Sequence, residues 1–159
     1  MTSSVLGRLA ELGLELPEVA APVATYVPAV RTGRYVYTSG QLPFVDGTLA
    51  ATGKVGDGEG LVGPLVAASL ARTAVLNALA AVASQIGSLD QVSRIVKVVG
   101  FVASDPSFTG QPAVVNGASV LLGEIFGEAG VHARSAVGVA VLPLDSPVEI
   151  ELVVELAEV

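Results

Sequence analysis

The chain has 159 residues, 52% of them hydrophobic and 14% charged, with no cysteine and one histidine. The lack of cysteine excludes disulfides, thiol nucleophiles and cysteine-based metal sites. A formal net charge of −7, from 8 basic and 15 acidic residues, argues against nucleic-acid binding, which depends on clustered lysine and arginine. The length indicates a single domain over residues 1–159 that can bury a sizeable core.

The most apolar stretch, residues 61–86, is interrupted by Pro64, Arg72, Asn77 and Gln85. It therefore falls short of the roughly 18 uninterrupted apolar residues that a membrane-spanning helix needs. Charged residues also occupy the part of the N-terminus where a secretory signal would carry its apolar segment. We expect a cytoplasmic protein that binds no membrane, and whose surplus apolar surface serves oligomerisation.

The first predicted elements are a helix and a β-hairpin. Residues 4–14 have amphipathic spacing and predict a helical N-terminal extension, over residues 1–16, with Ser4 as its N-cap. Residues 24–30 and 34–40 have the composition of two strands, and the Thr-Gly pair between them predicts the turn of a hairpin.

A loop and a long helix follow. Residues 41–60 are rich in glycine and predict a loop with a short strand near 48–51. Residues 61–87 predict a helix with Arg72 inside its apolar stripe. This arginine would extend its charged end to solvent, pair with an acid, or lie at a subunit contact. The stripe itself comprises Leu61, Leu65, Val75, Leu76, Leu79, Val82 and Ile86.

The second half of the chain begins with a strand and a second helix. Residues 91–103 are rich in β-branched side chains, which favour a strand. Residues 112–126 predict a helix that begins near Pro112, since proline suits the first helical turn. Its expected buried face comprises Val114, Ala118, Leu121, Leu122 and Ile125.

Two strands joined by a Leu-Pro-Leu-Asp-Ser-Pro segment end the chain. In the first of them, Arg134 shares a face with an alanine, a glycine and a second alanine. Such small side chains leave room for a ligand, another strand or another subunit to approach the backbone. In the second strand, Glu149 and two further glutamates alternate with apolar residues.

This order of elements predicts an α+β fold, in which one mixed β-sheet carries two helices on one face. We expect the helices to cover the valine face of the strand that carries Arg134. The small-residue face with Arg134 would then stay open, which favours a contact with another subunit.

Several segments resemble the YjgF/RidA family, also called endoribonuclease L-PSP. They are Thr-Ser-Gly-Gln-Leu-Pro at 38–43, Val-Asn-Gly-Ala at 115–118, and His-Ala-Arg-Ser-Ala-Val-Gly-Val-Ala-Val-Leu-Pro at 132–143 followed by Val-Glu-Ile-Glu at 148–151. The C-terminal motif is the specific one, and the likeness runs from about residue 24 to residue 156. The resemblance implies a chorismate-mutase-like fold and a homotrimer, whose sheets form a central barrel with ligand sites in the clefts between subunits.

The activity implied by this resemblance is hydrolysis of reactive 2-enamine and 2-imine acids, such as 2-aminoacrylate, to 2-keto acids and ammonia, without cofactor or metal. Arg134 would bind the substrate carboxylate, because a guanidinium offers a planar bidentate fork. Glu149 would position or activate water, and an imine, already electrophilic, needs little more than that. The resemblance also assigns to the substrate site Tyr26, Ser39, Gly40, Asn116 and Ala136.

The chain departs from the pattern of that family. Ala136 stands where deaminase members often carry cysteine, so a role of the thiol is excluded and a role of the backbone carbonyl is retained. The N-terminal helix and the extra residues around 110–112 set the chain in a divergent branch. His132 lies two residues before Arg134, and for a lone histidine a structural role is favoured over acid–base chemistry.

Other functions stay open. A non-catalytic trimer that binds small carboxylates, as a sensor or regulatory protein, would need the same arginine pocket. Ribonuclease action, suggested by the family's second name, fits poorly with the acidic composition. Four of the site residues also have a structural interpretation: Arg134 at an interface, Glu149 on a solvated strand, Tyr26 in packing and Asn116 bonded to backbone.

Overall fold

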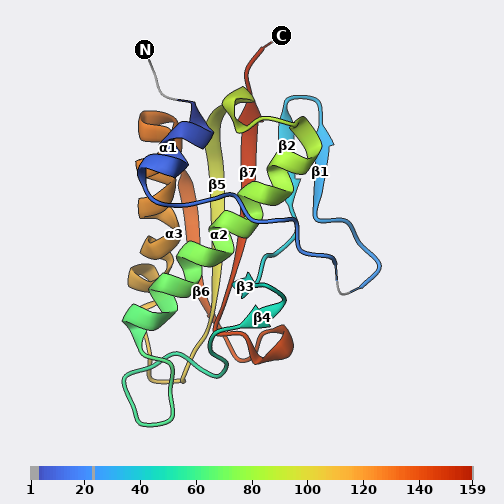
Figure 1. Cartoon of the computed structure of the whole chain (residues 1–159). Coiled ribbons are helices and arrows are strands. Elements are labelled where there is room, and N and C mark those ends of the chain that lie inside the picture. Colours follow the sequence, from blue (N-terminus) through green and yellow to red (C-terminus); the bar gives the residue numbers. More distant parts are fainter. Residues whose placement is uncertain (1–3, 23, 159) are drawn as a thin grey trace.

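The structure is a computed structural model that describes residues 4–22 and 24–158. Its main sheet has the order β1-β2-β7-β5-β6, in which only β5 and β6 run parallel. Helices α2 and α3 cover one face of this sheet, and α1 packs beside α3 (Figure 1). The sheet strands are β1 (Ala29–Thr32), β2 (Tyr35–Thr38), β5 (Val92–Ala103), β6 (Ala133–Val139) and β7 (Val148–Leu156).

The helices are α1 (Val5–Glu11), α2 (Pro64–Ile86) and α3 (Gln111–Phe126), and a separate hairpin pairs β3 (Phe44–Val45) with β4 (Thr48–Leu49). Short 3-10 turns lie at Leu89–Gln91, Gly127–Gly130 and Pro143–Asp145. The mixed α+β fold that the sequence predicts is thus confirmed, with helix α1 added to the two on the sheet.

The N-terminal helix is part of the packed structure. Ser4 caps it, since its hydroxyl accepts a hydrogen bond from the backbone N–H of Gly7 at 3.0 Å. Leu9 is 1% exposed and belongs to the core, and Arg8 donates to the carbonyl oxygen of Glu124 at 2.9 Å. These contacts hold the extension against α3.

Helix α2 buries Val75, Leu79 and Val82, as the predicted apolar stripe requires. Leu65, predicted inside the same stripe, is 88% exposed, and Leu61 precedes the helix. Five alanines share the buried face and let the helix approach the sheet closely; these are Ala67, Ala71, Ala74, Ala78 and Ala81. Its length and hydropathy would also suit a membrane span, but 61% of its most apolar window is buried, as in the core helix of a globular fold.

Arg72 of α2 pairs with an acid, which is one of its three predicted environments. Its Nη1 lies 2.9 Å from Oε2 of Glu124 on α3. Both side chains are more than one-third exposed, so the pair contributes little beyond orienting the two helices.

The structure reverses the predicted orientation of β6. The face that carries Arg134 and Ala136 is turned toward α3, and a Cβ at Gly138 would lie 2.8 Å from Nε2 of Gln111. The valine face points away, leaving Val137 42% exposed. A helix of the same chain occupies the room that the small side chains leave, which the prediction did not consider.

No helix of the described residues covers the other face of the sheet, and we call it the open face. Along β7, side chains that point to the open face alternate with side chains that point to the core. The core residues Ile150, Leu152 and Val154 are buried as predicted. The strand register places on the open face Val30, Tyr35, Tyr37, Val137, Glu149, Glu151 and Glu155. Tyr35 and Tyr37 are 40% and 48% exposed, so this face is partly apolar.

Candidate functional site

Arg134 lies under the first half of α3, and that helix determines the position of its guanidinium. Nη1 donates to Oδ1 of Asn116 at 2.7 Å and to the hydroxyl oxygen of Ser119 at 3.2 Å. Nη2 donates to the carbonyl oxygen of Pro112 at 3.3 Å. These acceptors are neutral, and no carboxylate within the described part of the chain pairs with this arginine. Its charge is therefore available to an anion.

Four other predicted site residues gather at the end of β2. A Cβ at Gly40 would overlap Oε1 of Glu149, so only glycine allows this carboxylate to approach the backbone there. The hydroxyl of Ser39 donates to the carbonyl oxygen of Val27 at 2.6 Å. Tyr26 is 44% exposed and lines, with Gly40, a small cavity of about 40 Å³. Tyr26 precedes β1, which begins later than predicted because Pro28 cannot donate to a strand ladder.

The two groups lie on opposite faces of the sheet. Arg134 is opposite Val98, and Val98 is opposite Leu152, so these three side chains point to the helical face. Glu149 lies three positions before Leu152 on β7 and points to the open face. Strand β5 also separates β6 from β7, and neighbouring strands lie about 4.8 Å apart. One chain therefore does not bring Arg134 and Glu149 together.

We call these groups the arginine half-site, comprising Arg134, Asn116 and Ser119, and the glutamate half-site, comprising Tyr26, Ser39, Gly40 and Glu149. Ala136 belongs to neither, because it packs against the core below α3. The structure therefore brings the residues of each half-site together, but within one chain the two half-sites stay apart.

Comparison with known proteins agrees with this architecture. The family model described as "YjgF/chorismate mutase-like, putative endoribonuclease" matches residues 6–156. The chain belongs to this family. Its relative from Trypanosoma cruzi, the protein TCP17, is 43% identical over 153 residues, covering 96% of this chain and 94% of TCP17.

Solved structures of family relatives have the same fold. The Agrobacterium tumefaciens protein Atu1372, of unknown function, is 42% identical with a TM-score of 0.87, covering 96% of this chain and 92% of that one. Escherichia coli TdcF with bound serine is 26% identical with a TM-score of 0.64, covering 88% and 94%. The fold is thus the YjgF/chorismate-mutase-like one, in a divergent branch. Family membership supports a small-molecule-processing or regulatory role, and members are typically homo-oligomers that bind small ligands.

In this YjgF-family chain, sequence reasoning missed Ser119 and assigned no contact to His132. The ring nitrogen Nδ1 of His132 lies 2.6 Å from the carbonyl oxygen of Gly130, so it carries a proton. In the neutral imidazole, Nε2 then accepts from the hydroxyl of Ser119 at 2.8 Å, and that hydroxyl oxygen accepts from Arg134. The structural interpretation of His132 is favoured, since it orients the serine that holds the guanidinium. Asn116 and Ser119 are three residues apart and so lie on the same face of α3, and this spacing could have indicated that Ser119 accompanies Asn116 at the site.

Glu149 is held in a partly desolvated position. Burial raises the pKa of the Glu149 carboxyl above its ordinary value of 4.5, and the charge of Glu151 raises it further. Burial also raises the pKa of Glu151. Within the described residues, neither carboxylate has an ion-pair partner. A carboxylate with these properties is a stronger base than an exposed glutamate.

We expect Glu149→Gln to raise the melting temperature at pH 7 by about 1–2 °C, a small effect because water still screens this half-exposed group. A raised pKa means that the folded protein disfavours the ionised form. The ionised Glu149 therefore destabilises the folded protein fully above the raised pKa and not at all below the ordinary pKa of 4.5. The gain in melting temperature from Glu149→Gln should accordingly vanish at pH 4. Thermal unfolding at both pH values tests this, with the exposed Glu59→Gln as control. Equal gains at pH 4 and pH 7 would contradict it.

Proposed function

We propose that the protein is a cofactor-free hydrolase of reactive 2-enamine and 2-imine acids, which it converts to 2-keto acids and ammonia. The observation that carries the proposal is the guanidinium of Arg134, held by neutral oxygens and lacking an acid partner among the described residues. A carboxylate can replace the weak 3.2 Å and 3.3 Å contacts and pair with the planar fork. Asn116, at 2.7 Å, would keep the fork oriented.

The reaction needs one water and a proton carrier. In the protonated imine tautomer, water adds to the carbon of the C=NH2+ bond while one of its protons passes to the Glu149 carboxylate, and the nitrogen becomes a neutral amine. The proton on Glu149 then passes to this amine, the C–N bond breaks, and ammonia leaves as the C=O bond forms. The hydroxyl proton released in that step passes to the Glu149 carboxylate and then to solvent. The raised pKa of Glu149 suits these transfers. No metal or organic cofactor enters this scheme.

The proposal includes a homotrimer, because the arginine half-site of one copy needs the glutamate half-site of another. Two features support this assembly. Strand β6 is an edge strand, and Val30, Tyr35, Tyr37 and Val137 expose apolar surface on the open face. Sheets that face one another would bury those side chains. In this scheme the site is complete only in the cleft between subunits.

Serine in the TdcF structure supports the ligand class. Serine is a small 2-amino acid, and it shares with 2-aminoacrylate a carboxylate beside the carbon that bears nitrogen. We extend the proposal to a cytoplasmic location and to a function without nucleic acid, in keeping with the absence of cysteine and the net charge of −7.

A complementation assay tests both the chemistry and the shared site. Wild type should hydrolyse 2-aminoacrylate, generated by a coupled enzyme, well above the uncatalysed rate. Arg134→Ala and Glu149→Gln should each be inactive. After the two variants are unfolded and refolded together, random trimers should recover about a quarter of the wild-type activity, since each site needs the right pair of neighbours.

Two outcomes would contradict the proposal. Wild type without activity above background would exclude the hydrolase, and saturable binding of serine or a 2-keto acid without turnover would then favour a carboxylate-binding regulatory protein. Active wild type without recovery in the mixed sample would exclude the shared site.

A further inference from the structure

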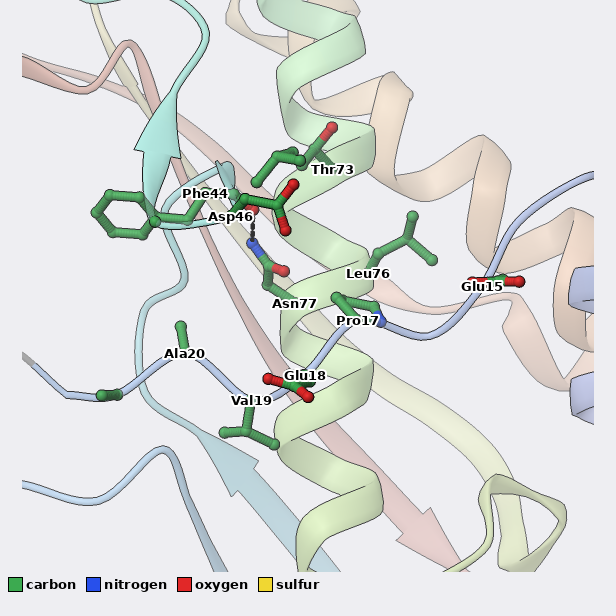
Figure 2. A pocket seen from close by; sticks show the side chains of 13 residues that line it. Glu15, Pro17, Glu18, Val19, Ala20, Phe44, Asp46, Thr73, Leu76 and Asn77 are labelled. Atoms are coloured by element: carbon green, nitrogen blue, oxygen red, sulfur yellow. Dashed lines mark hydrogen bonds between the residues drawn. The ribbon is translucent and has the colours of Figure 1, made fainter.

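A second cavity adjoins the small one at the glutamate half-site, with which it shares Ala20, Ala21 and Phe44. It has a volume of about 710 Å³ and lies between helix α2, the β3–β4 hairpin and the segment that follows α1 (Figure 2). Its apolar lining includes Pro17, Val19, Phe44 and Leu76. This volume lies in the range of small-molecule sites, which are concave and mostly apolar with a few polar groups. None of the residues of either half-site lines it.

The charged groups around this cavity are all negative. Glu15, Glu18 and Asp46 line it, and no lysine or arginine does among the residues that the structure describes. In the described ranges none of the three carboxylates forms an ion pair. Asp46 belongs to the two-residue turn of the hairpin, where its φ of 50° and the φ of 75° at Gly47 hold it above α2. The cavity is thus surrounded by uncompensated negative charge.

A buried amide adds an acceptor to the cavity. Asn77 on α2 is 3% exposed, and its Nδ2 donates to the carbonyl oxygens of Leu42 and Phe44, both at 3.0 Å. These two bonds determine which end of the amide is oxygen. Oδ1 has no hydrogen-bond donor among the described residues and is turned away from Phe44 toward the cavity (Figure 2). Because no side-chain polar atom of the described residues is both fully buried and without a partner, Oδ1 is accessible from the cavity, where it can accept a hydrogen bond from a ligand.

The arrangement does not suit a single metal ion. No group of three acidic or histidine side chains in the described residues converges closely enough to hold one. The carboxylates instead lie around an apolar floor. They match a ligand that carries separate positive charges with N–H donors at the ends of an apolar chain.

We propose that this cavity binds an aliphatic di- or polyamine. The ammonium groups lie against Asp46 and Glu18, and the methylene chain lies on Leu76, Pro17 and Phe44. One N–H group donates to Oδ1 of Asn77. The hydroxyl of Thr73, which donates to the carbonyl oxygen of Ser69 at 3.4 Å, offers its oxygen as a further acceptor.

Calorimetric titration of the full-length protein with 1,5-diaminopentane and with spermidine tests this proposal. Both amines should bind saturably and raise the melting temperature, while 1,5-pentanediol should not, since it supplies the chain without the charges. Asp46→Asn, which keeps a residue suited to positive φ, and Glu18→Gln should each weaken binding by about three- to fivefold. Asp57→Asn removes one charge at an exposed position outside the cavity and should change the affinity less than twofold.

The proposal is overturned if the amines bind no better than the diol, or if magnesium chloride at equal ionic strength reproduces their effect. It is also overturned if Asp57→Asn weakens binding as much as Asp46→Asn. These outcomes are independent of the proposed hydrolase, because the cavity shares no residue with the half-sites.

Discussion

Arg134→Lys should lower kcat/KM for the imine of 2-aminoacrylate by about 100-fold, and Arg134→Ala by about 1000-fold. Lysine keeps the charge but cannot pair with both carboxylate oxygens in one plane, and its ammonium has three N–H donors in place of the five with which the guanidinium serves Asn116, Pro112 and the substrate. Alanine removes the charge as well. The measurement is steady-state hydrolysis coupled to the formation of 2-aminoacrylate.

The matched control for this prediction is Arg8→Lys, an identical replacement on α1, far along the chain from both half-sites. It loses the bond to the carbonyl oxygen of Glu124 and should leave kcat/KM within twofold of wild type. If Arg134→Lys retained most of the activity, the carboxylate would bind elsewhere, and the proposed function would lose its anchoring residue.

Gly117→Ala should destabilise the fold by about 2–4 kcal/mol, the largest stability effect we expect from a single methyl group. A Cβ at Gly117 on α3 would overlap the backbone carbonyl oxygen of Ala68 on α2. Backbone cannot move aside as a flexible side chain can, so the two helices must separate. Urea denaturation followed by circular dichroism measures the loss. Because Asn116 is adjacent to Gly117, the hydrolase activity should fall together with the stability.

Gly123→Ala is the matched control for the helix packing. Gly123 lies on the same helix, and nothing lies within 4 Å of its would-be Cβ. Alanine there should stabilise the protein by roughly 0.5–1 kcal/mol, because glycine is a poor helix former. If both variants changed the stability equally, helix propensity rather than the contact with Ala68 would be responsible.

Local patterns in the sequence were sufficient for most of the secondary structure. The alternation in 148–156 identified the buried face of β7, and the spacing in 112–126 identified the buried face of α3. The same reasoning placed Val75, Leu79 and Val82 correctly in the core but failed at Leu65, which lies in the first turn of α2 and is 88% exposed. It also began the first strand too early, before Pro28.

The candidate site was predictable as a set of residues but not as an arrangement. The resemblance to the family indicated Arg134, Asn116, Glu149 and Gly40, and the structure groups them in two pairs. Neither pair is close in sequence, so no local pattern could report that Asn116 holds the arginine or that Glu149 approaches Gly40. The link through Ser119 to His132 depends on the same tertiary contact.

The sequence by itself determined the element types, the mixed α+β fold class and the family, because strand and helix periodicity and the 132–143 motif are local properties. Only the tertiary structure decided that α3 covers the Arg134 face of β6 and that Glu149 faces the other way. Both depend on which face of the sheet the helices occupy, and hydrophobic patterning does not specify this for a strand whose two faces carry small and apolar residues alike.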